Sequence, residues 1–173
     1  MKRDYIDFQD RSVALAYLIT FRCYGTWLHG DDRGSVDRRY FNRFGSPKIE
    51  PDSEKVERRE CLLRSQPFVL GQRERGVVKG AIKETCSLRN FLLHALSIRT
   101  NHAHVVVGNS GTPERMMGAF KAIATRALRT AGLLGEDDKA WSRHGSTRYL
   151  WTESDVTNAI DYVLYSQGDD LIG

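Results

Sequence analysis

The sequence lacks any apolar run long enough to cross a membrane. A transmembrane helix needs about 20 consecutive apolar residues, and none of that length occurs in the 173 residues. The first residues, MKRDYIDFQDRS, are also too polar for a secretory signal. We therefore expect a soluble, cytoplasmic protein with no membrane partner.

Cysteine is also scarce. The chain has three cysteines, Cys23, Cys61 and Cys86, and no two of them are spaced as CxxC. An odd number without paired spacing is typical of reduced thiols in a reducing compartment. The sequence therefore predicts neither a disulfide framework nor a cysteine-based zinc site.

The chain also lacks internal repeats and low-complexity segments, and its length suits one domain over residues 1–173. Basic residues exceed acidic ones, 26 against 22, which gives a net charge of +4. This excess fits a polyanionic partner such as nucleic acid. Many soluble proteins without such a partner carry a similar charge, so charge alone does not decide the matter.

Hydrophobic patterning predicts seven regular elements. They are a strand at 14–24, a helix at 72–89, strands at 90–98 and 102–107, a helix at 113–132, a strand at 147–151 and a helix from Ser154 or Asp155 to Gln167. This order favours an α+β fold on the ferredoxin-like (RRM-like) plan, an antiparallel sheet with helices on one face. The other face of the sheet would stay partly open.

Residues 25–67 are poor in apolar side chains and are predicted to be a long loop or insertion, with one short helix near DSEKVERRECLL. Three arginines in this segment could contact DNA phosphates: Arg33, Arg38 and Arg39. Aspartates lie among them, so a solvated loop with self-compensating charges is an equal alternative.

Two histidines open the third strand, NHAHVVV. Residues i and i+2 of a strand project from the same face, so His102 and His104 could converge on one divalent cation. Mg²⁺ or Mn²⁺ would need further oxygen ligands, whereas Zn²⁺ accepts nitrogen more readily. The alternative is a pair of exposed or hydrogen-bonded histidines at the start of a strand.

The last predicted helix, AIDYVLYSQ, carries two tyrosines beside an apolar stripe. A tyrosine hydroxyl near a metal-polarised phosphate can attack phosphorus and form a phosphotyrosine ester. The alternative is that Tyr162 and Tyr165 serve only in packing.

Together these segments resemble a known family. NHAHVVV resembles the HUH motif (His, hydrophobic, His) of single-tyrosine HUH transposases, which include insertion-sequence enzymes and REP-associated tyrosine transposases. In that family a basic helix, a strand and a final helix follow the motif, and the final helix bears the nucleophilic tyrosine and an amide ligand. FKAIATRAL, TRYLW and AIDYVLYSQ stand here in the same order.

The resemblance implies roles for four residues. His102 and His104, on a central strand, would ligate Mg²⁺ or Mn²⁺, and Tyr162 on the C-terminal helix would be the nucleophile. Gln167 would be a further ligand, although it follows Tyr162 by five residues where the family usually has four. Tyr165 is the alternative nucleophile, but no amide follows it at a useful spacing.

The function implied is metal-dependent nicking and strand transfer of single-stranded DNA through a 5′-phosphotyrosine, on hairpin or palindromic substrates, by a monomer or a homodimer. Basic and aromatic stretches before the last helix add expected DNA contacts at Lys121, Arg126, Arg143, His144 and Arg148. For Lys121 and Arg126 a solvated helix face is the alternative. Two other functions stay open: a domesticated, cleavage-inactive protein that binds nucleic-acid hairpins, and a water-using metal-dependent phosphodiesterase.

Overall fold

The computed structural model describes residues 13–26, 52–61, 63 and 65–166. Its elements are β1 Ala16–Cys23, α1 Ser53–Cys61, α2 Gln72–Leu88, β2 Leu93–Ile98, β3 His102–Gly108, α3 Pro113–Thr130, β4 Trp141–Leu150 and α4 Glu153–Tyr165. None of these helices is both long enough and apolar enough to span a membrane. All seven expected elements are present, and so is the short helix expected near residue 53.

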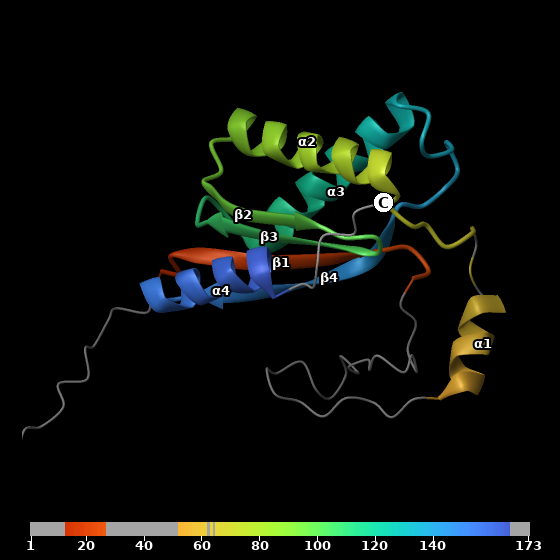
Figure 1. The fold of residues 1–173 in the computed structure, drawn as a ribbon, viewed down its shortest axis with the longest axis horizontal. Coiled ribbons are helices and arrows are strands. Elements are labelled where there is room, and N and C mark those ends of the chain that lie inside the picture. The colour runs from red at the N-terminus through yellow and green to blue at the C-terminus, as the bar shows by residue number, and fades with distance from the viewer. Residues whose placement is uncertain (1–12, 27–51, 62, 64, 167–173) are drawn as a thin grey trace, which may run out of the picture.

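The four strands form one sheet in the order β2-β3-β1-β4, and each neighbouring pair is antiparallel. This is the ferredoxin-like strand order, so the expected α+β fold class is confirmed. Strand β3, which begins with the two histidines, is central and pairs with both β1 and β2. The histidine strand therefore has neighbours on both sides (Figure 1).

Alternate residues of the two central strands face opposite layers. Val105 and Val107 of β3, with Ile19 and Phe21 of β1, are fully buried in a core cluster that also contains Phe120 of α3. Helices α2 and α3 cover this face of the sheet (Figure 1). Because side chains alternate along a strand, the histidines of β3 point to the other face.

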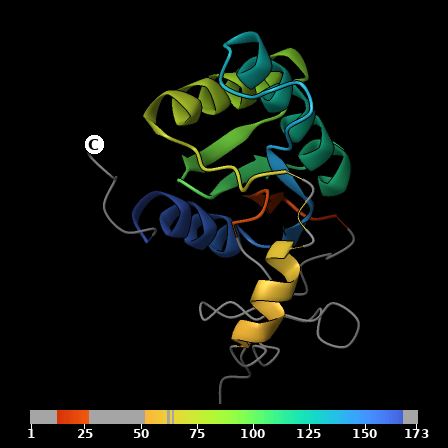
Figure 2. The same cartoon turned by 90° about the vertical axis from the view of Figure 1, so that its right-hand side faces the viewer.

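Helix α4 lies on that other face, so the three helices do not all share one face as expected (Figure 2). Ala159 and Val163 of α4 pack in a second cluster with Val106, Ala95 and Leu150 of the sheet. The run of three valines in β3 places apolar side chains on both faces, and each face must then be covered. This placement brings α4 to the side on which the histidines project.

Strand β4 begins at Trp141, six residues before the expected start at Thr147. It is an edge strand that pairs with β1 alone within the described sheet, and half of its residues are exposed. Trp141 holds its first residues against α3, because the indole Nε1 donates to the Lys121 carbonyl at 3.2 Å. The segment SRHGS has no apolar side chains, so the hydrophobic pattern did not predict that it belongs to a strand.

The N-cap of helix α4 lies two or three residues before the expected caps Ser154 and Asp155. Thr152 is the N-cap: its hydroxyl accepts from the Asp155 N–H at 3.0 Å, and Asp155 Oδ2 accepts from the Thr152 N–H at 3.1 Å. Burial opposes ionisation of Asp155, but these bonds, the Trp151 N–H and the charge of Arg148 lower its pKa overall. The capping box fixes the direction in which α4 leaves β4.

All three cysteines are free thiols, as expected. Cys23 and Cys86 are buried in the core, whereas Cys61 is exposed on α1. Burial raises the pKa of Cys23 to about 12 and that of Cys86 to about 11. The two buried thiols therefore act as small apolar side chains rather than as nucleophiles.

A glycine of β4 lies at a close approach between α3 and the sheet. A Cβ on Gly145 would collide with the Met117 side chain and lie 2.5 Å from the Thr20 carbonyl oxygen, whereas a Cβ on Gly118 of α3 would meet nothing within 4 Å. We expect Gly145→Ala to lower the free energy of unfolding by about 1–3 kcal/mol, because the strand must shift. Gly118→Ala should raise it by about 0.5–1 kcal/mol, as in other exposed helix interiors.

Urea unfolding followed by tryptophan fluorescence measures both changes, and Gly118→Ala is the matched control. Equal unfolding midpoints for Gly145→Ala and the parent protein would show that β4 does not approach α3 this closely.

Candidate active site

The two histidines of β3 lie together on the face covered by α4. Their ring centroids are 4.7 Å apart, with the ring planes at 77°. His104 is 6% exposed, which is unusual for a polar side chain and requires polar partners. His102, at the start of the strand, is only partly buried. The site is therefore half enclosed, with one imidazole inside the protein and the other near its surface.

Tyr162 of α4 contacts the His104 ring from the helix layer on this face. Its ring centroid is 5.6 Å from that of His104 in an edge-on contact. Ala159 and Val163 are the buried residues of α4, and Tyr162 lies between them in sequence, toward the edge of the buried stripe. The ring is held against His104 while 44% of the side chain stays exposed. The phenol is thus both fixed and reachable from outside.

Tyr165 is placed differently. It is the last residue of α4 and is 76% exposed. The ring in contact with His104 is that of Tyr162, three residues earlier. Of the two tyrosines considered from the sequence, Tyr162 is therefore the one beside the histidines.

Each imidazole is bonded through Nδ1 to a neighbouring oxygen. His104 Nδ1 lies 2.7 Å from Thr20 Oγ1 of β1, and His102 Nδ1 lies 2.6 Å from Asn101 Oδ1. Sequence reasoning missed both partners. The position of Asn101 directly before the first histidine was a visible signal, whereas Thr20 becomes a neighbour only through the pairing of β1 with β3.

The two imidazoles are a partial donor set for a divalent cation. With Nδ1 of each ring engaged by an oxygen, Nε2 is the atom that would ligate a metal, as in most metal-bound histidines. The described residues contain no group of three or more His, Cys, Asp and Glu side chains suited to hold a metal. Two imidazole nitrogens would thus need oxygen ligands from elsewhere, a mixed set that suits Mn²⁺ better than Mg²⁺. Gln167, the expected amide ligand, lies outside the described residues.

A cationic side chain that the sequence did not indicate lies next to this site. Arg22 of β1 pairs with His102 of β3 across the strands, so both side chains project from the face of α4. Arg148 of β4 lies opposite Leu18 of β1 on the same face. Arg22 follows Thr20 by two residues in the first strand, so strand alternation could have placed both side chains on one face of the sheet.

The expected DNA contacts fall into three groups. Arg143, His144 and Arg148 all lie on β4 and are exposed. Arg33, Arg38 and Arg39 lie outside the described residues. Lys121 and Arg126 lie on α3, which covers the face away from the histidines.

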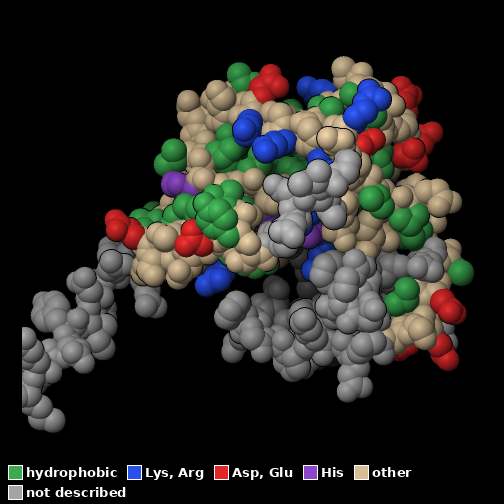
Figure 3. Space-filling model, viewed as in Figure 1, with side chains coloured by type: hydrophobic (Ala, Val, Ile, Leu, Met, Phe, Trp, Pro, Cys, Tyr) green, Lys and Arg blue, Asp and Glu red, His purple; other side chains and the backbone are tan. Residues whose placement is uncertain are grey.

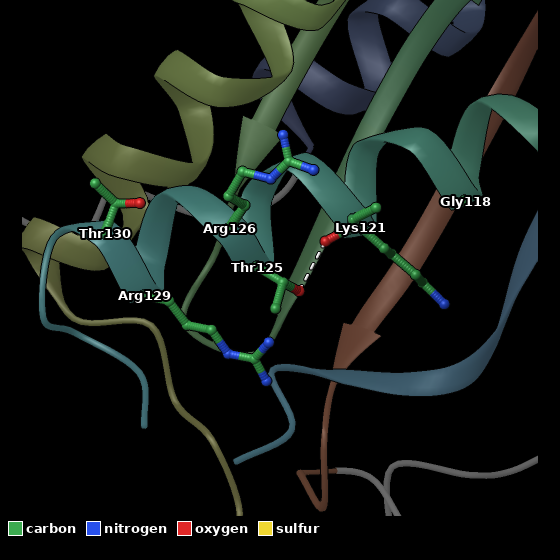
Figure 4. A pocket seen from close by; sticks show the side chains of 7 residues that line it. Gly118, Lys121, Thr125, Arg126, Arg129 and Thr130 are labelled. Atoms are coloured by element: carbon green, nitrogen blue, oxygen red, sulfur yellow. Dashed lines mark hydrogen bonds between the residues drawn. The ribbon is translucent and has the colours of Figure 1, made fainter. Parts of the chain in front are cut away.

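Lys121 and Arg126 line a shallow groove of about 640 Å³ along α3 (Figure 4). Lys121 Nζ donates to the carbonyl oxygens of Ser142 at 2.8 Å and His144 at 3.1 Å, so it joins α3 to the start of β4. Figure 3 shows the Lys and Arg side chains of the described residues scattered over the visible face rather than gathered in one patch. No single basic patch therefore marks a DNA-binding surface on this face of the described residues.

Comparisons with known proteins come from solved structures, because no family model and no curated protein matches the chain. A REP-associated tyrosine transposase bound to a REP hairpin is 14% identical, with a TM-score of 0.49 over 94% of this chain and 68% of that one. A Deinococcus radiodurans protein assigned as a transposase is 12% identical, with a TM-score of 0.46 over 94% of both chains.

Proposed function

We propose that this chain cleaves and rejoins single-stranded DNA, with Tyr162 as the nucleophile and His102 and His104 as metal ligands. The observation that supports the proposal best is the cluster of three rings, with centroid separations of 4.7 Å between the histidines and 5.6 Å between His104 and Tyr162. Residues of β3 and α4, about 60 positions apart, form it within one chain. We therefore propose a site that assembles in cis; the homodimer remains a prediction.

The reaction is a transesterification at phosphorus. The Tyr162 oxygen loses its proton and bonds to phosphorus, while the bond from phosphorus to the 3′ oxygen breaks. That oxygen takes up a proton and leaves as a 3′-hydroxyl, so the 5′ side of the break stays attached to the tyrosine. A Mg²⁺ or Mn²⁺ ion bound at His102 and His104 would withdraw charge from a non-bridging phosphate oxygen. The 3′-hydroxyl of another strand can reverse the step, because the ester retains the bond energy.

The substrate class follows from access to the phenol. Tyr162 is held against His104 at the boundary between α4 and the sheet, with less than half of its side chain exposed. A regular duplex holds its backbone in a fixed geometry, whereas an unpaired strand can bend its backbone toward the phenol. Single-stranded DNA beside a hairpin offers this backbone, so we propose hairpin or palindromic DNA as the partner.

The test is covalent capture on a denaturing gel. The protein is incubated with Mn²⁺ and a library of hairpins that carry random single-stranded flanks, labelled at the 3′ end or the 5′ end. A 5′-phosphotyrosine leaves the 3′ label on the protein and releases the 5′ label as a free fragment. Cleavage without a covalent band would favour the water-using phosphodiesterase, and binding without cleavage would favour the domesticated hairpin-binding protein.

Arg22 supplies a prediction about phosphate binding. It lies beside His102 on the face of α4, so we propose that its guanidinium binds the phosphate that Tyr162 attacks. Arg22→Ala should slow cleavage about 100-fold, as does the loss of one donor to a transition state. Arg22→Lys should recover part of the rate. The measurement is single-turnover cleavage of a captured hairpin.

Arg115→Ala is the matched control, because Arg115 is an exposed arginine of α3 on the opposite face. An equal fall in Arg22→Ala and Arg115→Ala would indicate a general loss of DNA attraction rather than a contact at the site. Lys121 and Arg126 lie on the same side of the sheet as Arg115. A DNA strand bound at the histidines would have to extend round the edge of the sheet to contact them.

A further inference from the structure

The two histidines are bonded in the same way although their partners come from different parts of the chain. Asn101 directly precedes β3, whereas Thr20 lies in the middle of β1. In both cases an oxygen lies within 2.7 Å of Nδ1. With Nδ1 bonded to oxygen in both rings, a metal would bind each of them at Nε2.

Asn101 is held firmly in place by the end of β1. Its carbonyl oxygen accepts from the Cys23 N–H at 2.8 Å and from the Thr26 hydroxyl at 3.4 Å. The Arg99 N–H donates to the His102 carbonyl at 2.8 Å and closes the turn between β2 and β3. The Asn101 side chain thus reaches the imidazole from an anchored backbone.

Thr20 is fixed by the sheet itself. It lies directly opposite His104 in the pairing of β1 with β3, so their side chains are neighbours on one face. A β-branched side chain has a restricted χ1 angle, which lowers the cost of holding the hydroxyl beside the ring. Because His104 is buried, water does not easily reach its Nδ1, and the Thr20 hydroxyl supplies the hydrogen bond there.

The bond to Asn101 selects the tautomer of His102, and the bond to Thr20 is compatible with the same tautomer in His104. An amide oxygen only accepts, so His102 Nδ1 must carry the proton and Nε2 must carry the lone pair. The Thr20 hydroxyl can accept in the same way from His104. A free neutral histidine side chain prefers the other tautomer, in which the proton on Nε2 blocks metal binding.

We infer that Asn101 and Thr20 are positioning residues that hold both imidazoles in the Nδ1–H form, the form in which a metal would bind at Nε2. The inference rests on the proposed function, because a preference for one tautomer matters only if the histidines bind a metal. The tautomers themselves are a property of the metal-free protein and can be measured without DNA, metal or activity.

The first experiment is long-range ¹H–¹⁵N NMR of the full chain labelled at histidine, without metal, at about pH 8, where imidazole is neutral. We expect His102 and His104 to show protonated Nδ1 and unprotonated Nε2. Asn101→Ala should shift His102 toward the Nε2–H form, and Thr20→Val should do so for His104. Asn101→Asp and Thr20→Ser keep an acceptor and should keep the parent pattern, which separates the role of the bond from a folding defect.

The second readout is Mn²⁺ affinity by calorimetry. Asn101→Ala and Thr20→Val should each weaken binding about 10-fold to 100-fold, whereas Asn101→Asp and Thr20→Ser should change it far less. Ser97→Ala is the matched control, because Ser97 faces His104 from β2 on the other side. It should leave both the tautomer and the affinity unchanged.

Failure of the inference is distinguishable from failure of the proposed function. If either histidine is Nε2–H in the parent protein, or if Asn101→Asp and Thr20→Ser behave like the apolar variants, the inference is overturned even if DNA is cleaved. If the tautomers are as expected but no covalent DNA band forms, the proposed function fails and the assignment of Asn101 and Thr20 stands.

Discussion

Tyr162→Phe is expected to abolish the covalent protein–DNA band and to reduce strand cleavage by about 10⁴-fold or more. The variant removes the oxygen that bonds to phosphorus in the proposed reaction but keeps the ring that packs on His104. Because the side chain is 44% exposed, the free energy of unfolding should change by about 1 kcal/mol or less. Denaturing gels with 3′-labelled hairpin measure the band, and urea unfolding confirms that the variant is folded.

Tyr165→Phe is the matched control, since it makes the same change three residues further along α4 at a side chain that is 76% exposed. It should retain both the band and the cleavage rate. Loss of the band in Tyr165→Phe together with its survival in Tyr162→Phe would reverse the assignment. Cleavage that survives in both variants would point to water as the nucleophile.

His104→Gln is expected to weaken Mn²⁺ binding about 100-fold or more and to reduce cleavage at least in proportion. Removal of a ligand should cost more than the 10-fold to 100-fold typical of losing an outer hydrogen-bond partner. Glutamine keeps a polar side chain of similar length at this buried position, which limits the damage to packing. Calorimetry with Mn²⁺ and single-turnover cleavage are the measurements.

His94→Ala is the control for this experiment, because His94 is an exposed histidine of β2 in the same sheet. It should leave Mn²⁺ affinity and cleavage unchanged. Undiminished Mn²⁺ binding in His104→Gln would contradict the metal assignment. A mixture of His104→Gln and Tyr162→Phe tests the cis arrangement: no recovery of the covalent band is expected, whereas recovery would show that two chains exchange their tyrosines.

The order of elements was predictable because it depends on local patterns. The β-branched stretch of β1, the apolar stripe of α2 and the cap of α3 at Thr112 each lie within a few consecutive residues. Predictions were poorer where the structure depends on a distant partner. Strand β4 is polar and exists through its pairing with β1, so its first six residues were not recognised.

The side of the sheet on which α4 lies could not be predicted from the helix itself. Its buried residues, Ala159 and Val163, form a stripe that would suit either face. A clue lay in β3 instead, where three consecutive valines put apolar side chains on both faces and so require a cover on each. The expectation of helices on one face did not use that clue.

The sequence alone determined the fold class, the alternation that places His102 and His104 on one face of a strand, and the position of two tyrosines on the last helix. Only the tertiary structure decided that Tyr162 rather than Tyr165 meets His104, that Thr20 and Asn101 bond the two imidazoles, and that Arg22 lies beside His102. Periodicity along a chain records which face a side chain occupies. It does not record which strand or helix lies opposite, because that depends on how the whole core packs.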